Sequence, residues 1–293
     1  MSGKLYLVAT PIGNLEDITL RALRILKEVD IIAAEDTRNT LKLLNHFEIK
    51  KPLISNHRHN EDDREDVLIN KLKEGKNIAV VSDAGTPGIS DPGEVIVKKA
   101  IEENIQVIPI PGACAAINAL IASGLDTKEF TFFGFLPLNK KLRKEKLEEI
   151  KNESKTSIIY EAPHKIKDSL KDLKTVIGNR KVVLAREITK IHEEFIRGNI
   201  DDIIDKSDDL KGEMILLIEG GEKEILENVL NNLSLEEHYN IYEKQGLDKK
   251  EINKKIAKDR GVNKNEIYKY FIKYAKDADE KDLDYLISNK NSK

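Results

Sequence analysis

Short apolar runs alternate with helix-spaced segments over the first 124 residues. Runs such as Ile31–Ala34 and Ile78–Val81 are almost wholly apolar, which is typical of buried parallel strands. Between such runs, as in Thr19–Val29, apolar residues recur every three or four positions. This rhythm predicts an α/β fold with a mostly parallel sheet and helices on both faces. The expected strands are Leu5–Ala9, Ile31–Ala34, Leu53–His57, Ile78–Val81 and Gln106–Ile110, and the expected helices are Thr19–Val29, Thr40–Phe47, Asp63–Lys73, Glu94–Glu103 and Ala113–Ser123.

A second α/β segment begins after Gly124, and the last 70 or so residues contain only helical patterns. The pattern therefore predicts an N-terminal α/β domain over 1–124, a C-terminal α/β domain over 125–221 and a helical tail over 222–293. The second segment is expected to hold strands from Phe130 and over Ser157–Tyr160, Lys181–Ala185, Glu194–Arg197 and Met214–Ile218, with helices over Lys140–Lys151 and Lys165–Val176.

Composition narrows the class of protein. Charged residues make up 34% of the 293 positions, yet the net charge is only -3, so any nucleic-acid contact must use a local basic patch. A single cysteine, Cys114, excludes an intramolecular disulfide and a cysteine-rich metal site. No apolar run is long enough to span a membrane, and the first expected strand leaves no room for a signal peptide, which predicts a cytoplasmic protein with no membrane partner.

The loops that follow four of the expected strands have unusual compositions. The longest, Ser82–Gly93, holds three Gly, two Pro and two Asp, which is typical of a rigid loop where a backbone approaches a ligand. Neither a P-loop nor a Gly-x-Gly-x-x-Gly motif is present. Because parallel strands end on one edge of a sheet, the four loops predict a single cleft. They are Thr10–Asn14, Ala34–Arg38, Ser82–Gly93 and Pro111–Ala115.

Four motifs closely resemble those of the ribosomal RNA small subunit methyltransferase I family, within the tetrapyrrole methylase superfamily. The resemblance runs from about Lys4 to Gly220. The motifs are Leu7–Ile18 (LVATPIGNLEDI), Ala34–Arg38 (AEDTR), Ser82–Gly93 (SDAGTPGISDPG) and Tyr160–His164 (YEAPH).

The resemblance implies methyl transfer from S-adenosylmethionine to the ribose 2′-hydroxyl of a cytidine in 16S rRNA. It implies two α/β domains with the cofactor in the cleft between them, 16S rRNA or the small ribosomal subunit as partner, and a homodimer. Family members commonly carry Ser or Thr where this chain has Cys114, so a hydroxyl contact there would be weakened. The cofactor residues implied are Pro11, Asp83, Ala84, Gly85, Ile89, Cys114 and Ala115, with a looser match at Tyr160, Ala185 and Ile215.

The residues agree with a cofactor that carries no phosphate. Lys and Arg, which would repel a sulfonium, are absent from Ser82–Gly93, and Asp83 is an acceptor for the adenosine part. A ribose hydroxyl is a poor nucleophile, so a nearby base or hydrogen-bond acceptor would help. The candidates are Asp36, Glu161 and Glu187, for each of which a helix cap or a structural ion pair is an equal alternative.

Candidate RNA-binding residues lie both near the cleft and in the tail. Arg38 and Arg186 are candidates for phosphate contacts, unless they pair with the neighbouring carboxylates. His57 and Arg58 lie in a polar loop that favours RNA contact over metal binding, because the His57–His59 spacing lacks further ligands. No metal site is predicted.

The tail from Lys244 to Lys276 carries 11 Lys or Arg and 4 Asp or Glu, a net +7, in a helix–turn–helix pattern. Ile252, Ile256 and Ala257 are expected to face Val262 and Ile267. Lys254, Lys255 and Lys264 are the candidate RNA contacts, and a solvated helical surface or packing on the second domain is the alternative.

Two other functions compete with rRNA methylation. One is methylation of a tetrapyrrole or another small metabolite on the same fold, against which the basic tail and the Ala34–Arg38 motif argue. The other is a non-catalytic RNA-binding protein of ribosome assembly, against which the intact cofactor loops argue.

Overall fold

The computed structural model describes residues 2–57, 61–208, 210–221 and 229–273. The chain divides into two compact units, Met1–Gly221 and Glu222–Lys293. The first unit contains two five-stranded sheets, which we call the N-terminal and C-terminal lobes, and the second unit is helical where it is described. No helix among the described residues is long and apolar enough to cross a membrane.

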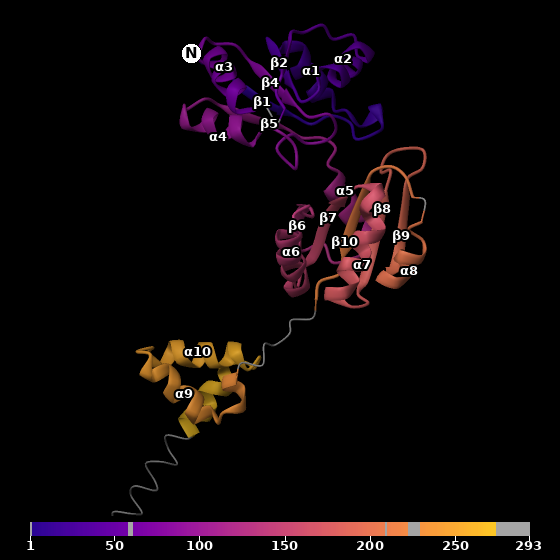
Figure 1. The fold of residues 1–293 in the computed structure, drawn as a ribbon. Coiled ribbons are helices and arrows are strands. Elements are labelled where there is room, and N and C mark those ends of the chain that lie inside the picture. The colour runs from indigo at the N-terminus through magenta and orange to yellow at the C-terminus, as the bar shows by residue number, and fades with distance from the viewer. Residues whose placement is uncertain (1, 58–60, 209, 222–228, 274–293) are drawn as a thin grey trace, which may run out of the picture. The chain divides into compact units, whose positions relative to one another are not determined.

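The sheet of the N-terminal lobe is parallel throughout, as the pattern predicted. Its strand order is β3-β2-β4-β1-β5. The apolar runs are buried on both faces, with α1 and α2 packed on one face and α3 and α4 on the other (Figure 1). The elements are β1 (Leu5–Val8), α1 (Leu20–Glu28), β2 (Ile31–Ala34), α2 (Thr37–His46), β3 (Leu53–Ser55), α3 (Glu61–Lys73), β4 (Ile78–Val81), α4 (Glu94–Glu102) and β5 (Val107–Ile110), with a short 3-10 turn at Leu15–Asp17.

The sheet of the C-terminal lobe is mixed, with the order β6-β7-β10-β8-β9. Only the β6–β7 pair is parallel. Helices α6, α7 and α8 cover one face, and α5 covers the other. The elements are α5 (Ala115–Ser123), β6 (Phe130–Phe135), α6 (Lys140–Asn152), β7 (Thr156–Glu161), a 3-10 turn (Pro163–Lys165), α7 (Ile166–Ile177), β8 (Lys181–Arg186), β9 (Glu194–Asn199), α8 (Ile200–Asp205) and β10 (Met214–Ile218).

Helix α5 precedes the expected boundary at Gly124 but packs on the second sheet, through Ala116, Ala119 and Leu120. The guanidinium of Arg197, on β9, donates to the last carbonyls of α5 at Ala122 (2.7 Å) and Ser123 (3.2 Å). These carbonyls have no partners within the helix, so Arg197 satisfies them from the second sheet. The division at residue 124 stays a prediction, while the packing joins α5 to the C-terminal lobe.

Two helices differ from the sequence-based expectation for a local reason. Helix α2 begins at Thr37 rather than Thr40 because the side chain of Asp36 accepts a hydrogen bond from the Arg38 N–H at 2.8 Å and caps the helix. Helix α8 was not expected at all. It is short, and it starts at a capping box formed by Asn199 and Asp202.

The second unit is built from α9 (Leu235–Lys244), α10 (Lys249–Asp259) and helical residues 264–273, preceded by a 3-10 turn (Val229–Asn232). Ile252, Ile256 and Ala257 pack with Ile267, as the pattern predicted. The expectation for Val262 was wrong: its side chain is 39% exposed, because the turn before residue 264 directs it to solvent.

A buried polar cluster lies inside this unit. His238 is fully buried, and its Nδ1 accepts a hydrogen bond from the Arg260 guanidinium at 3.3 Å. Its Nε2 lies 3.4 Å from the Asp259 carboxylate, which also accepts from the Tyr242 hydroxyl. Burial lowers the pKa of His238 below its ordinary 6.5, and the Arg260 charge lowers it further.

The second unit should therefore lose stability on mild acidification. The unfolded chain takes up the His238 proton more readily than the folded chain, so the free energy of unfolding is undiminished above about pH 6.5 and falls below it. Hydrogen exchange of α9 and α10, corrected for intrinsic rates, should show less protection at pH 5.5 than at pH 7.5. The same loss should persist in His46→Gln, whose side chain is exposed on α2, and pH-independent protection would contradict the assignment.

Candidate active site

Loops from both lobes enclose one pocket of about 430 Å³, within the range of roughly 300–1,000 Å³ for small-molecule sites. All four strand-end loops of the N-terminal lobe contribute, through Ile12, Glu35, the 83–91 segment and Cys114. The single cleft predicted from the parallel strands is therefore present. The lining residues are Ile12, Glu35, Asp83, Ala84, Gly85, Thr86, Ile89, Ser90, Asp91, Cys114, Ala115, Phe135, Tyr160, Glu161, Ala162, Pro163, Ile188, Gly212, Glu213, Met214 and Ile215.

Backbone hydrogen bonds tie the loop after β4 to the loop after β1. The Thr10 N–H donates to the Gly85 carbonyl at 2.8 Å, and the Gly85 N–H donates back to Thr10 at 3.1 Å. Gly85 has φ +81, and a Cβ there would lie 3.2 Å from Ile12 Cγ2. The position thus needs glycine for both its conformation and its contact. The Thr86 hydroxyl joins the third loop by donating to the Ala113 carbonyl at 3.1 Å.

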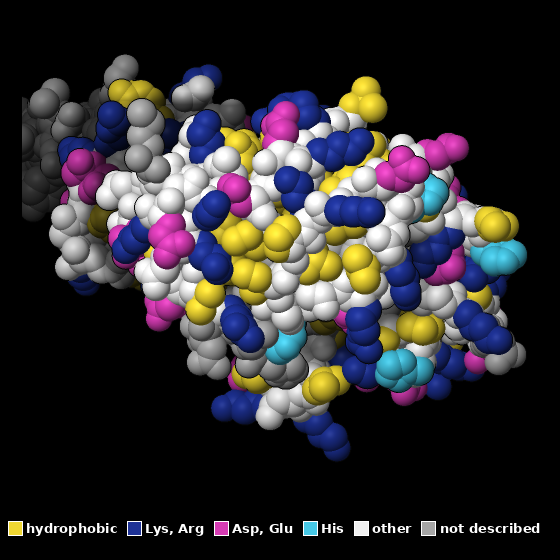
Figure 2. Space-filling model, turned by 90° about the horizontal axis from the view of Figure 1, so that it is seen from above, with side chains coloured by type: hydrophobic (Ala, Val, Ile, Leu, Met, Phe, Trp, Pro, Cys, Tyr) yellow, Lys and Arg dark blue, Asp and Glu magenta, His cyan; other side chains and the backbone are white. Residues whose placement is uncertain are grey.

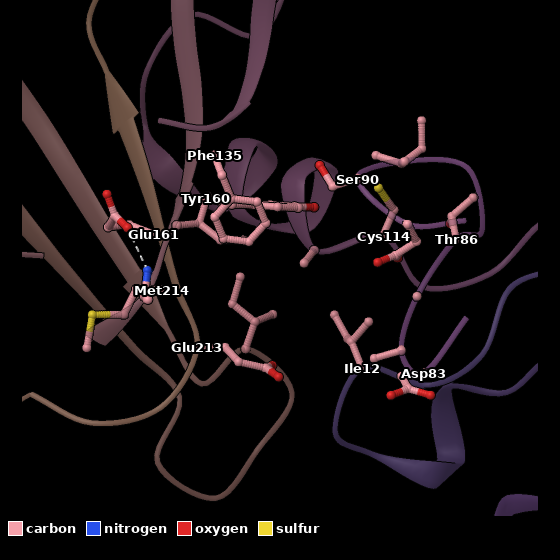
Figure 3. A pocket seen from close by; sticks show the side chains of 18 of the residues that line it. Ile12, Asp83, Thr86, Ser90, Cys114, Phe135, Tyr160, Glu161, Glu213 and Met214 are labelled. Atoms are coloured by element: carbon pink, nitrogen blue, oxygen red, sulfur yellow. Dashed lines mark hydrogen bonds between the residues drawn. The ribbon is translucent and has the colours of Figure 1, made fainter. Parts of the chain in front are cut away.

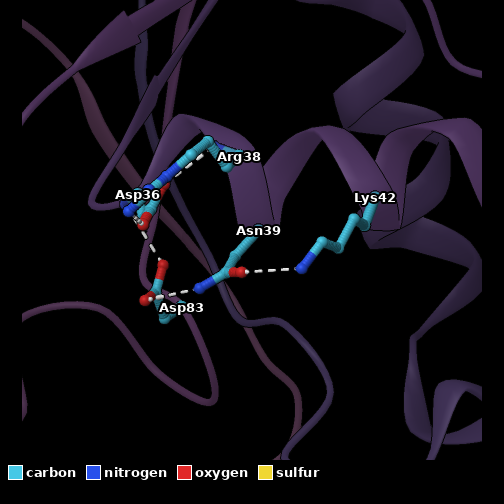
Figure 4. Close-up of polar contacts among 5 residues, drawn as sticks. All are labelled: Asp36, Arg38, Asn39, Lys42 and Asp83. Atoms are coloured by element: carbon cyan, nitrogen blue, oxygen red, sulfur yellow. Dashed lines mark hydrogen bonds and ion pairs between the residues drawn. The ribbon is translucent and has the colours of Figure 1, made fainter.

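Asp83 connects the same loop to the start of α2 (Figure 4). One carboxylate oxygen accepts from the Asp36 N–H at 3.1 Å, and the other accepts from the Asn39 amide at 3.1 Å. The Asp83 N–H in turn donates to the Glu35 carboxylate at 3.2 Å. Asp83 is exposed at the pocket wall, and each of its oxygens keeps a second lone pair for a ligand.

Asp36 takes the structural alternative that its sequence context left open. Its carboxylate caps α2 and forms an ion pair with Arg38, and it is not among the lining residues. The side-chain hydrogen bond from Arg38 lowers the pKa of Asp36 to about 2. Arg38 is 85% exposed despite this pair, so its guanidinium faces solvent beside the cleft loops.

Strand alternation separates the residues of the Tyr160–His164 motif. Tyr160 and Ile215 point to the α5 face of the second sheet and line the pocket, and Ala185 lies fully buried on the same face without lining it. Figure 3 shows the Tyr160 and Phe135 rings together at the wall that faces Cys114. Burial raises the pKa of Tyr160 to about 12, so its hydroxyl stays protonated.

Glu161 points to the opposite face, as its neighbour in the strand must. Its carboxylate accepts hydrogen bonds from the Ser169 hydroxyl on α7 and from the Ala162 N–H. Ser169 also accepts from the Arg143 guanidinium at 2.9 Å. The side chain is 6% exposed, and Figure 3 shows its carboxylate on the far side of the strand from the Tyr160 ring, a placement that favours a structural role over that of a base.

Glu187 and Arg186 are held in ion pairs just outside the pocket lining. The Glu187 carboxylate accepts from Lys190 Nζ at 2.9 Å and from the Glu213 N–H at 3.0 Å. The Lys190 hydrogen bond lowers the pKa of Glu187 below its ordinary value. Arg186 pairs with Glu194 at 2.6 Å.

The remaining candidates divide between the two units. Pro11 is buried and does not line the pocket, while Ala84, Ile89, Cys114 and Ala115 do. His57 is partly buried, and Arg58 lies outside the described residues. Lys254, Lys255 and Lys264 are exposed on the second unit. No group of three or more His, Cys, Asp or Glu in the described part of the chain is arranged to hold a metal ion.

Sequence reasoning missed the wall formed by Gly212, Glu213 and Met214 at the start of β10. A Gly-Glu pair before an apolar run is too common to be a signal, and only the sheet order brings it to the pocket. Ile12 and Glu35 were also missed, although both lie inside motifs that the sequence singled out.

Comparison with known proteins fixes the family. The family model for Tetrapyrrole (Corrin/Porphyrin) Methylases matches residues 4–204. A protein of Halalkalibacterium halodurans called ribosomal RNA small subunit methyltransferase I is 53% identical over 92% of this chain and 94% of its own length. Proteins of the same name from Bacillus subtilis (48% identical, covering 91% and 93%) and Escherichia coli O157:H7 (46%, covering 92% and 94%) also match.

The chain belongs to the ribosomal RNA small subunit methyltransferase I family of tetrapyrrole methylases. Two solved structures share the fold at low identity. The methyltransferase CobJ has a TM-score of 0.58 and 17% identity, covering 75% of this chain and 95% of that one. Uroporphyrin-III C-methyl transferase from Thermus thermophilus, complexed with S-adenyl homocysteine, has a TM-score of 0.52 and 16% identity, covering 74% and 97%. The resemblance and the fold class drawn from the sequence are confirmed.

Removing the Asp83 carboxylate should weaken cofactor binding. Asp83→Ala loses a polar pocket contact and two hydrogen bonds that hold the loop, at a cost of about 1–3 kcal/mol, or roughly 5–150-fold in affinity. Calorimetric titration with S-adenosylhomocysteine measures this. Asp126→Ala, in an exposed turn outside the pocket lining, is the matched control, and unchanged affinity in a folded Asp83→Ala protein would refute the role.

Proposed function

We propose that this protein transfers a methyl group from S-adenosylmethionine to a ribose 2′-oxygen of a cytidine in the 16S rRNA of the small ribosomal subunit. Methyl transfer is the activity of the family to which the chain belongs. The substrate is the one that the relatives' name gives, ribosomal RNA of the small subunit. The cytidine and the ribose oxygen rest on the motif resemblance at Ala34–Arg38 and Tyr160–His164.

The observation that carries the proposal is the charge of the pocket. Its described lining holds no Lys, Arg or His, and it holds five carboxylate residues, of which only Glu161 directs its carboxylate to the other face of the sheet. A phosphate group is commonly bound by cations or by backbone N–H groups, whereas a sulfonium is repelled by nearby cations. The acidic lining therefore fits S-adenosylmethionine, which supplies a methyl group already activated by its positive sulfur.

The chain's own residues would hold and orient that cofactor. The 83–85 segment offers the Asp83 carboxylate and backbone groups to the adenosine part, and Ile12, Ala115 and Ile215 offer apolar contacts. The two lobes would hold the bound hydroxyl and the methyl group in line.

One face of the first unit carries mixed charge. On the face shown in Figure 2, Lys and Arg side chains lie among acidic and apolar ones. Because the net charge of the chain is only -3, we expect local contacts to hold the RNA. Arg38 at the cleft and the Lys residues of the second unit are the contacts that we propose.

The acceptor is identified by one assay with three arms. Labelled S-adenosylmethionine is incubated with small subunits that lack the modification, with free 16S rRNA and with a tetrapyrrole precursor. We expect label in the RNA arms and none in the tetrapyrrole, and mass spectrometry of digested RNA should place the methyl group on ribose. A methyl group on a nucleobase would refute the 2′-oxygen, and a labelled tetrapyrrole would favour the metabolite methylase.

The exposed lysines of the second unit should strengthen RNA binding without affecting the cofactor. Lys254→Gln, Lys255→Gln and Lys264→Gln together should weaken RNA affinity and reduce its salt slope by about 0.7–0.9 for each phosphate that the variant no longer neutralises. A second triple variant at exposed Lys27, Lys98 and Lys128 removes the same charge from the first unit. Equal salt slopes in the two triple variants would show that the second unit is not an RNA-binding element.

We also propose a homodimer, as the family resemblance implies. Ile117 and Ile121 lie one turn apart on α5 and are 42% and 68% exposed, which is consistent with a face covered by a second copy. Light scattering coupled to size exclusion measures the mass directly.

A further inference from the structure

Glu213 is the one carboxylate residue of the described pocket lining to which neither the cofactor loops nor a structural contact assigns a function. Glu35, Asp83 and Asp91 lie on the loops assigned to the cofactor, and Glu161 points to the other face of its sheet. Glu213, at the start of β10, stands in the pocket lining with its side chain 74% exposed. Figure 3 shows its carboxylate directed across the opening toward the loops that carry Ile12 and Asp83.

Lys190 contacts this carboxylate. Its Nζ lies 3.1 Å from Glu213 Oε2 and 2.9 Å from Glu187 Oε1. Burial opposes the charge on Lys190, but the two carboxylates outweigh it and raise the pKa of the ammonium. Lys190 also packs against Gly13 of the N-terminal lobe. The contact is so close that a Cβ on Gly13 would lie 2.5 Å from Lys190 Cγ.

The loop that presents Lys190 is strained. Glu187 and Thr189 have φ values of 51 and 67, in the left-handed region that side chains other than glycine's rarely adopt. The Thr189 N–H donates to the Glu193 carboxylate at 2.6 Å, and a Cβ on Gly212 would lie 2.2 Å from Glu187 Oε1. Strain of this kind persists where the surroundings impose it, and it clusters at functional sites.

Space for an acceptor adjoins this cluster. A second cavity of about 390 Å³ shares Pro163 and Gly212 with the cofactor pocket. Its lining includes His164 and Lys211, which suit a nucleotide phosphate, and also Lys167, which is paired with Asp208 of the same lining. Glu213 lines the cofactor pocket and follows Gly212, which lines both cavities.

We propose that Glu213 is a catalytic residue that accepts the proton of the attacking hydroxyl and that Lys190 is its positioning residue. The inference rests on the proposed function. The hydroxyl oxygen forms a bond to the methyl carbon, the carbon–sulfur bond breaks with its electron pair passing to sulfur, and the proton goes to the Glu213 carboxylate. S-adenosylhomocysteine and the methylated ribose leave, and solvent takes the proton from Glu213.

The test is single-turnover methylation of unmodified small subunits over pH 5–9. Glu213→Gln should lower the rate by about 10²–10⁴-fold and abolish the acid limb of the pH profile, with S-adenosylhomocysteine affinity within about threefold of the wild type. Lys190→Met should lower the rate and leave the affinity for S-adenosylhomocysteine unchanged, because Glu213 loses the cation that contacts it, and Lys190→Arg should restore the rate. Glu219→Gln, which removes a carboxylate paired with Lys181 at the other end of β10, is the matched control.

The outcomes separate the two proposals. A wild type that methylates small subunits, together with a folded Glu213→Gln protein of equal rate, overturns the role of Glu213 and leaves the proposed function standing. A wild type that methylates no small subunit overturns both. A slow Glu213→Gln protein that keeps the wild-type pH profile shows that Glu213 is structural and also overturns the inference.

Discussion

The parallel direction of all five strands in the N-terminal lobe is the constraint on which the site depends. Because β1, β2, β4 and β5 run the same way, the loops that follow them meet on one edge. The reciprocal hydrogen bonds between Thr10 and Gly85 then lock two of these loops together, and Asp83 ties one of them to the start of α2. The pocket wall is thus built before any ligand arrives, which reduces the conformational entropy that binding must overcome.

The C-terminal lobe supplies the other wall of the pocket. The antiparallel pairing of β7 and β10 brings Tyr160 and Ile215 to one face. The start of β10 lines the same pocket as the loops of the N-terminal lobe. Lys190, which is paired with Glu187 and Glu213 of its own lobe, contacts Gly13 of the N-terminal lobe. A pocket whose described lining lacks Lys, Arg and His, with Lys190 just outside it, suits both the proposed sulfonium site and the proposed proton acceptor.

Much of the fold could be predicted from the sequence, because its strands and loops are marked by short local patterns. Runs such as Ile78–Val81 are short and uniformly apolar, and the loops after them carry Gly and Pro, which disfavour continuing a strand or a helix. The candidate base was harder to find because it depends on which face of a strand a residue occupies. The period of two should have placed Glu161 opposite Tyr160, and that signal was available. Glu213 offered no such signal, since only the pairing of β10 between β7 and β8 brings it to the pocket.

A crystal structure with bound S-adenosylhomocysteine tests the central claim most directly. We expect the ligand between the lobes, with its adenosine part against the 83–85 loop and its sulfur on the side of the pocket that holds Glu213. Density for the ligand outside this pocket, or a sulfur turned away from Glu213 with Lys or Arg side chains closing on it, would contradict the account.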